Sequence, residues 1–155
     1  NTMKIFIITI CNKNENYEKL ITEKYEKLIR NFYDLEFINI NFKKEKNNKN
    51  FYKEEYQKAI SLIKPNSIVV ALDELGKVYK SIEFSKKMKF WLENSSNIYF
   101  LIGGPNGLSE EVINKADYVF SLSNLTFPHV LAKIILIEQI YRSICIMNKH
   151  PYHRS

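Results

Sequence analysis

Three segments in the C-terminal third of the chain have residue types that suit a bound ligand. They are a glycine turn, GGPNG at residues 103–107, then SLSNLTFPH at 121–129, and a terminal HPYHR at 150–154. Glycine lets a backbone approach a ligand closely, but it also suits a tight strand-to-helix turn, so both roles stay open for the first segment. Its spacing, GGxxG, differs from the GxGxxG of dinucleotide-binding sheets.

The histidines and cysteines do not form a pattern that binds metal. The chain has only three His and two Cys, and tetrahedral zinc needs a convergent ligand set whose spacing is absent here. Cys11 and Cys145 have no paired spacing, so we expect reduced thiols. The sequence therefore predicts no metal and no disulfide.

An apolar segment at residues 130–145 separates the second motif from the third. It is apolar around much of a helical circumference, so a helix here is buried on more than one side: one side fits the protein's own sheet and another suggests a partner. Within it, Glu138 and Arg142 are four residues apart, which is typical of an intrahelical ion pair. Arg142 also remains a candidate contact to a phosphate or a base.

Alternating apolar segments position these residues. Strands are predicted at residues 4–10, 35–42, 68–72, 98–102 and 118–122. Helices are predicted at 17–32, 51–64 and 81–93, after residue 109 and from about residue 128, with Ser81 and Ser109 as N-caps. Several strands are continuous apolar runs, which indicates an α/β fold with a mostly parallel sheet covered by helices on both faces. We expect a single domain over residues 3–155.

The order of strands and motifs places the candidate ligand site. In an open α/β sheet, ligands bind beyond the carboxyl ends of the strands. Residues 73–77, 103–107 and 121–127 each follow a predicted strand, so we expect them at one edge of the sheet. The first strand is followed by CNKNE, without glycine. This absence disfavours an ordinary nucleotide-binding sheet.

Charge and hydropathy restrict the partners. The formal net charge of +6 favours a polyanionic partner, but composition alone does not name RNA. Much of that excess lies in KKEKNNKN at residues 43–50, which is more typical of a solvated loop. The apolar run at residues 5–10 is too short for a membrane span or a signal peptide. We therefore expect a soluble, cytoplasmic protein with no membrane partner.

Taken in order, the glycine turn, SLSNLTFPH, a helix with Glu138-Gln139 and Tyr141-Arg142, and the HPYHR tail resemble one family. It is the SPOUT-class ribosomal RNA large subunit methyltransferase H family, which methylates N3 of a pseudouridine. The resemblance covers nearly the whole chain. It implies a C-terminal trefoil knot, a homodimer, S-adenosylmethionine as cofactor, and large-subunit (23S) ribosomal RNA as substrate, in assembled ribosomes.

The resemblance also implies a set of cofactor contacts. They are Leu72, Gly103, Leu122, Ser123, Asn124, Leu125, Thr126 and Phe127. Leucine and phenylalanine side chains suit an adenine ring, while backbone groups around Gly103 and Leu122 would fix its orientation. Taken singly, Leu72 and Leu122 are more typical of a protein core.

For the tail, the resemblance implies that it reaches the cofactor pocket within the dimer. Tyr152 would stack on a pyrimidine, His153 would take the N3 proton or only orient the base, and Arg154 would hold a phosphate. In an arbitrary protein such a tail would be frayed. Lys133 stands where relatives commonly carry arginine, and a lysine cannot bind phosphate in the bidentate manner.

Two other functions stay open from the sequence. One is a catalytically silent RNA-binding dimer with the same fold, and the other is a nucleotide-binding protein of the flavodoxin type. The joint presence of the glycine turn, the SLSNLTFPH segment and the HPYHR tail argues against a silent protein.

Overall fold

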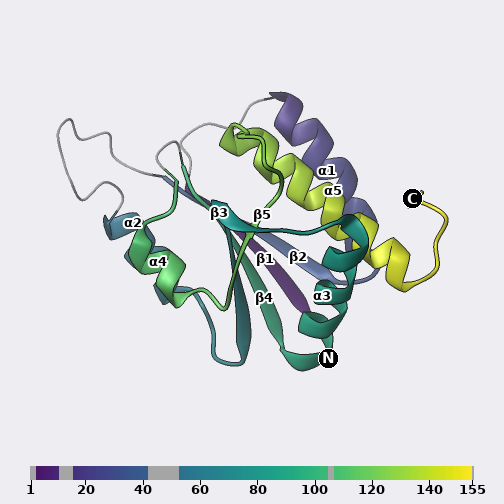
Figure 1. The fold of residues 1–155 in the computed structure, drawn as a ribbon, viewed down its shortest axis with the longest axis horizontal. Helices are drawn as coiled ribbons and strands as arrows, with labels where there is room; N and C mark the ends of the chain where they lie inside the picture. Colours follow the sequence, from purple (N-terminus) through teal and green to yellow (C-terminus); the bar gives the residue numbers. More distant parts are fainter. Residues whose placement is uncertain (1–2, 11–15, 42–52, 105–106, 155) are drawn as a thin grey trace.

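The computed structural model describes residues 3–10, 16–41, 53–104 and 107–154, in which strands and helices alternate (Figure 1). The strands are β1 (Lys4–Ile10), β2 (Asp34–Ile40), β3 (Ser67–Val78), β4 (Asn97–Ile102) and β5 (Tyr118–Ser121). The helices are α1 (Asn16–Arg30), α2 (Lys53–Ser61), α3 (Ser81–Asn94), α4 (Glu110–Lys115) and α5 (His129–Met147). The predicted alternation is confirmed. The lysine-rich run at 43–50 and the predicted start of α2 at residue 51 lie outside the described residues.

The strands form one parallel sheet in the order β2-β1-β4-β3-β5. β1 pairs with β2 on one side and with β4 on the other, and β3 joins β4 to β5. Parallel neighbours need crossover connections, which the helices provide. Because all strands run the same way, the segments that follow β3, β4 and β5 meet at one edge. The α/β fold with a parallel sheet, predicted from the sequence, is confirmed.

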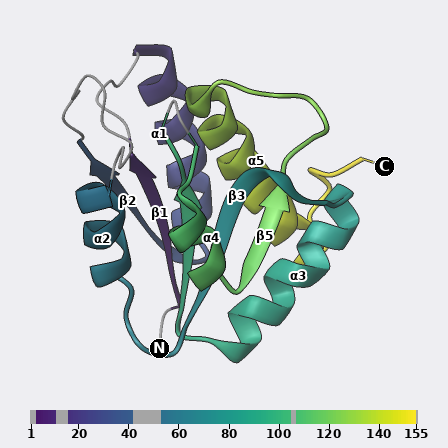
Figure 2. The same cartoon turned by 60° about the vertical axis from the view of Figure 1, so that its left-hand side comes forward.

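Helices cover both faces of the sheet. Figure 2 shows α1, α3 and α5 on one face and α2 and α4 on the other. Successive β1 side chains alternate between the two cores, with Ile5 and Ile7 in the first and Phe6 and Ile8 in the second. Both sets are almost fully buried. This explains why β1 is a continuous apolar run: each of its faces packs against helices.

The apolar circumference of α5 is covered largely by its own chain. The helix packs against both α1 and α3 as well as against the sheet. Ile137 and Ile144 have no exposed area, so a charge at either position would disrupt the core of the single chain. Leu131 is 40% exposed, and Ile134 and Ile135 are half-buried. A partner surface on α5 is therefore narrower than the sequence indicated.

β3 continues beyond the predicted end at Leu72. Leu72 and Lys77 both pair with Phe120 of β5, so the residues between them form a bulge in β3 opposite this one residue. A Cβ atom on Gly76 would lie 2.6–2.7 Å from three backbone atoms of Phe120. Only glycine allows two backbones to approach so closely. This bulged segment, which we call the 73–77 loop, therefore lies in close contact with the β5 backbone at Phe120.

The predicted N-caps have different outcomes. Ser109 caps α4 as expected, because its Oγ accepts the Val112 N–H at 3.3 Å. Ser81 is instead the first residue of α3, and its Oγ donates to Oε1 of Gln139 on α5 at 2.7 Å. The start of α3 is held by Glu83, whose Oε1 accepts the Lys80 N–H at 3.0 Å. The prediction that Ser81 is the N-cap was wrong, because its hydroxyl donates to Gln139 on α5 and Lys80 is the N-cap residue.

Within the described part of the chain, no helix has both the length and the apolar character needed to cross a membrane. Cys145 is a buried free thiol, whereas Cys11 lies outside the described residues.

Candidate active site

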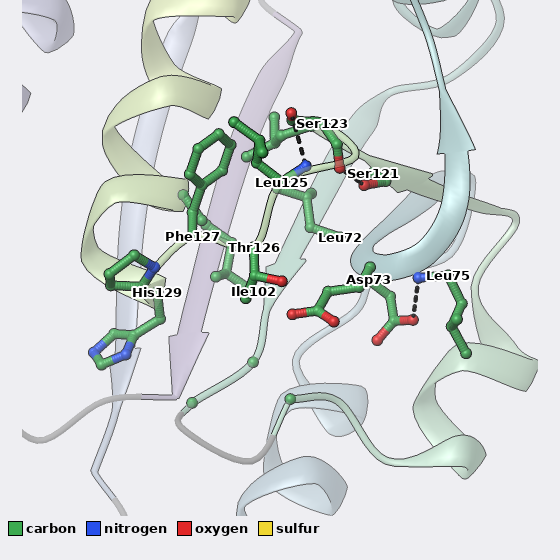
Figure 3. Close-up of a pocket in the computed structure, with 17 residues that line it drawn as sticks. Leu72, Asp73, Leu75, Ile102, Ser121, Ser123, Leu125, Thr126, Phe127 and His129 are labelled. Carbon is green, nitrogen blue, oxygen red and sulfur yellow. Dashed lines mark hydrogen bonds between the residues drawn. The ribbon is translucent and has the colours of Figure 1, made fainter.

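A cavity of about 780 Å³ opens at the carboxyl edge of β3, β4 and β5 (Figure 3). Its walls come from the loop after Leu72, the glycine turn, the segment after Ser121 and the first turn of α5. Cavities of this size hold small molecules in many proteins. The three segments that sequence reasoning placed at one edge therefore share one pocket.

Most of the predicted cofactor contacts line this pocket. They are Leu72, Gly103, Leu122, Ser123, Leu125, Thr126 and Phe127. Asn124 is exposed and is not among the lining residues. The segment is held in a compact bend, because Ser121 Oγ donates to the Ser123 carbonyl at 2.7 Å and Ser123 Oγ accepts the Leu125 N–H at 3.0 Å.

The glycine turn has its own packing reason for glycine. A Cβ on Gly103 would lie 2.4 Å from the Gly107 carbonyl carbon. Gly107 has φ of 74° and donates its N–H to the Gly104 carbonyl at 2.9 Å, and the Tyr56 hydroxyl donates to the Gly107 carbonyl. A side chain at Gly103 would therefore displace the turn itself before it displaced a ligand. Residues 105–106 lie outside the described residues.

Two carboxylates in the pocket wall were not singled out from the sequence. Asp73 and Glu74 follow directly after Leu72 and line the cavity. Asp73 Oδ2 accepts the Leu75 N–H at 3.0 Å, which stabilises the start of the loop. The sequence signal that could have identified them is a pair of acidic residues directly after a buried strand. They give one side of an otherwise largely apolar pocket a negative charge.

The C-terminal tail folds back on α5 rather than fraying. Lys149 adopts a left-handed conformation (φ of 56°), and the His150 N–H donates to the Cys145 carbonyl at 2.8 Å, which closes the helix end. The Tyr152 ring packs edge-on against Tyr141, with 4.8 Å between ring centroids.

Polar contacts fix the tail further. Tyr152 Oη donates to Glu138 Oε1 at 3.2 Å and lies 3.2 Å from Tyr25 Oη. Burial, followed by the hydrogen bond with Tyr25, raises the pKa of Tyr152. The pKa of Tyr141 rises to about 12, first through a hydrogen bond with Cys145 and then through burial. Both phenols are therefore neutral at physiological pH.

The predicted ion pair between Glu138 and Arg142 is confirmed. Arg142 Nε and Nη2 lie 2.8 and 2.6 Å from Glu138 Oε1. Arg142 Nη1 lies 3.0 Å from His153 Nδ1, and the guanidinium covers the Tyr152 ring at 4.9 Å. Arg142, Tyr152 and His153 therefore form one cluster, which we call the tail cluster, while Arg154 is exposed beside it.

Within one chain, the tail cluster and the pocket are separate. None of the described tail residues lines the pocket. Arg142 is ten residues beyond Ala132, the last pocket residue on α5, which corresponds to about 15 Å along the helix axis. Figure 1 likewise shows the C-terminus beyond the last turns of α5, at the opposite end of this helix from its first turn.

Lys133, at the position where relatives commonly carry arginine, is paired with a carboxylate of its own chain. Its Nζ lies 2.8 Å from Glu18 Oε1 on α1, and the two side chains are only 12% and 5% exposed. Nζ also lies 5.1 Å from the centre of the Phe37 ring. The residue joins α1 to α5.

Replacing Glu18 with glutamine is expected to lower the free energy of unfolding by about 3–5 kcal/mol, because the change leaves the Lys133 charge buried without its carboxylate. Urea unfolding followed by circular dichroism measures this. The matched control is Glu93→Gln, which breaks an exposed ion pair with Lys89 and should cost less than about 1 kcal/mol. Equal losses in the two variants would contradict the buried role of Lys133.

Within the described ranges, no three His, Cys, Asp or Glu residues are placed to hold a metal ion.

Comparison with known proteins identifies the family. The family described as "Predicted SPOUT methyltransferase" matches residues 3–153. Ribosomal RNA large subunit methyltransferase H of Acetivibrio thermocellus is 35% identical over 98% of this chain and 100% of its own. The protein of the same name from Clostridium kluyveri is 39% identical with the same coverage.

A solved structure agrees on the fold. A probable methylase family protein from Haemophilus influenzae superposes with a TM-score of 0.57 at 11% identity, over 97% of this chain and 70% of that one. At this identity the likeness concerns the fold alone. The sequence matches carry the assignment: the chain belongs to the SPOUT methyltransferases and, among them, to the ribosomal RNA large subunit methyltransferase H family.

Proposed function

We propose that this protein transfers a methyl group from S-adenosylmethionine to N3 of a pseudouridine in large-subunit ribosomal RNA, in the cytoplasm and on assembled ribosomes. The supporting observation is the pocket, which gathers seven of the predicted cofactor contacts at one edge of the sheet. Relatives that match this chain over their whole length are named as large-subunit ribosomal RNA methyltransferases. The net charge of +6 is consistent with an RNA substrate.

The residues of the pocket fit S-adenosylmethionine. Leu72, Leu122 and Phe127 provide apolar surface for the adenine ring, and the backbone of the 121–125 bend provides polar groups to orient it. Asp73 and Glu74 provide negative charge that suits a sulfonium and an ammonium group. When bound, the cofactor supplies an electrophilic methyl group.

The work left to the protein is alignment and the exclusion of water. The tail cluster supplies the Tyr152 ring and the His153 imidazole, which suit a pyrimidine, and the exposed Arg154 beside it suits a phosphate. Arg142 acts as a positioning residue, because its donors are directed at Glu138 and His153.

A homodimer joins the two halves of this site. In a two-fold dimer with antiparallel α5 helices, the tail cluster of one protomer lies beside the pocket of its partner. The exposed Leu131 and the half-buried Ile134 and Ile135 give α5 an apolar strip for that contact. Each site then combines a pocket from one protomer with a tail from the other. Residues 3–155 act in it as a single domain.

The C-terminal part of this domain forms a trefoil knot. The close contact between the 73–77 loop and the Phe120 backbone supports this, because in such a knot the chain that follows β5 would pass through that loop.

Calorimetry with matched pocket variants tests the function. Thr126 is an exposed lining residue, so Thr126→Trp should fill the pocket without disturbing the core, whereas Thr126→Ser should leave it open. Wild type and Thr126→Ser are expected to bind S-adenosylmethionine and to transfer a labelled methyl group to ribosomes, and Thr126→Trp to do neither.

Other outcomes separate the remaining functions. Binding of flavin mononucleotide in place of S-adenosylmethionine would support a flavodoxin-type protein. Binding of ribosomal RNA by wild type, without any methyl transfer, would identify a silent RNA-binding dimer.

A further inference from the structure

The tail cluster determines which nitrogen of His153 carries the proton. His153 Nδ1 lies 3.0 Å from Arg142 Nη1. A guanidinium has only donors and keeps its charge in proteins, so Nδ1 must be the acceptor in this bond. An imidazole that accepts at Nδ1 is neutral and carries its proton at Nε2. Nε2, the ring nitrogen that does not contact Arg142, is then an N–H donor.

This arrangement is imposed from α5. Two donors of Arg142, Nε and Nη2, are directed at Glu138 Oε1, and Oε2 of the same carboxylate accepts Gln139 Nε2 at 2.7 Å. The guanidinium plane also lies over the Tyr152 ring. Because the guanidinium plane and its Nε and Nη2 donors are held in place, Nη1 donates to His153. Glu138 and Arg142 therefore act on His153 as positioning residues.

The donor at Nε2 lacks an acceptor in the single chain. Among the described residues, His153 Nε2 is one of few buried side-chain atoms without a hydrogen-bond partner. An unpaired buried donor is unfavourable, because it has given up its hydrogen bond to water without gaining another. Because Nε2 is buried in the single chain, an acceptor from outside reaches it only if the tail shifts when the base binds, and the new hydrogen bond would then remove this cost.

We infer that His153 donates a hydrogen bond from Nε2 to a carbonyl oxygen beside N3 of the target base, and that it does not remove the N3 proton. This inference rests on the proposed function. Both carbonyl groups that flank N3 gain negative charge as its proton leaves, and a fixed donor stabilises that charge. The N3 proton first passes to solvent water; the N3–C bond then forms while the C–S bond breaks, with its electron pair left on sulfur.

Paired substitutions distinguish a donor from a base. The amide nitrogen of His153→Gln takes the place of Nε2 and can donate but cannot accept a proton. In His153→Asn the amide is shorter and takes the place of Nδ1. The single-turnover rate of methyl transfer should fall less than about tenfold in His153→Gln, and roughly 10²-fold or more in His153→Asn and His153→Ala. A base role predicts that all three variants are equally impaired, which would overturn the inference.

A spectroscopic measurement tests the tautomer independently of activity. In protein with 15N-labelled histidine, the His153 signal, assigned by its absence in His153→Gln, should show a protonated Nε2 and an unprotonated Nδ1. Arg142→Gln should remove this preference. A proton on Nδ1 in the wild type would refute the inference. A wild-type protein with the expected tautomer that methylates no ribosomal RNA would instead refute the proposed function, and the donor role with it.

Discussion

A heterodimer of two inactive variants is expected to recover about half of the wild-type methyl-transfer rate, because one of its two sites is then intact. The variants are Thr126→Trp, which fills the pocket, and His153→Ala, which removes the donor from the tail. In each homodimer both sites contain the lesion. In the heterodimer, the pocket of the His153→Ala protomer meets the wild-type tail of the Thr126→Trp protomer, and both lesions fall in the other site.

Co-expression with two different affinity tags gives the heterodimer, and labelled methyl transfer to ribosomes measures its rate. The control heterodimer pairs Thr126→Trp with a Thr126→Trp/His153→Ala double variant; neither protomer then has an open pocket, so it should stay inactive. If the first heterodimer forms but remains as inactive as its parents, the pocket and the tail of a site do not come from different protomers.

Gly76→Ala is expected to lower the free energy of unfolding by about 3 kcal/mol or more, at the upper end for overpacking, and to abolish S-adenosylmethionine binding. The new Cβ would lie 2.6–2.7 Å from backbone atoms of Phe120, a residue that is 4% exposed and paired within the sheet. The 73–77 loop must therefore move away, and Asp73, Glu74 and Leu75, which form a pocket wall, move with it.

Urea unfolding and calorimetry measure the two effects. The control is Gly107→Ala, where φ is 74° and the added Cβ meets nothing within 4 Å. Its cost is limited to the left-handed conformation, about 1–2 kcal/mol. A Gly76→Ala protein that binds the cofactor as tightly as Gly107→Ala would contradict the close contact between the loop and β5.

The parts of the fold that were predictable depend on local apolar patterns. β1 has apolar residues on both of its faces, and this is the pattern that a covered parallel strand requires. The position of the pocket at the sheet edge was also predictable. Leu72, Gly103 and Leu122 each lie at the end of a predicted parallel strand or directly after it, and such ends meet at one edge of the sheet.

The parts that were not predictable depend on contacts between distant segments. β3 runs past Leu72 because Lys77 and Val78 pair with β5, and the sequence around Gly76 has no apolar alternation that reveals it. Likewise, Ser81 has the residue type of an N-cap, and only the fold brings Gln139 within hydrogen-bonding distance of its hydroxyl. The buried ion pair of Lys133 with Glu18 was not predictable either, because the two residues are far apart in the sequence.

The most direct test of the proposed activity is a map of methylated nucleotides in large-subunit ribosomal RNA. RNA from cells with and without this gene is digested and analysed by mass spectrometry, and the deleted strain is complemented with wild type, Thr126→Ser or Thr126→Trp. We predict that deletion removes the N3 methyl group from a pseudouridine, that wild type and Thr126→Ser restore it, and that Thr126→Trp does not. An unchanged methylation map in the deleted strain would contradict the account.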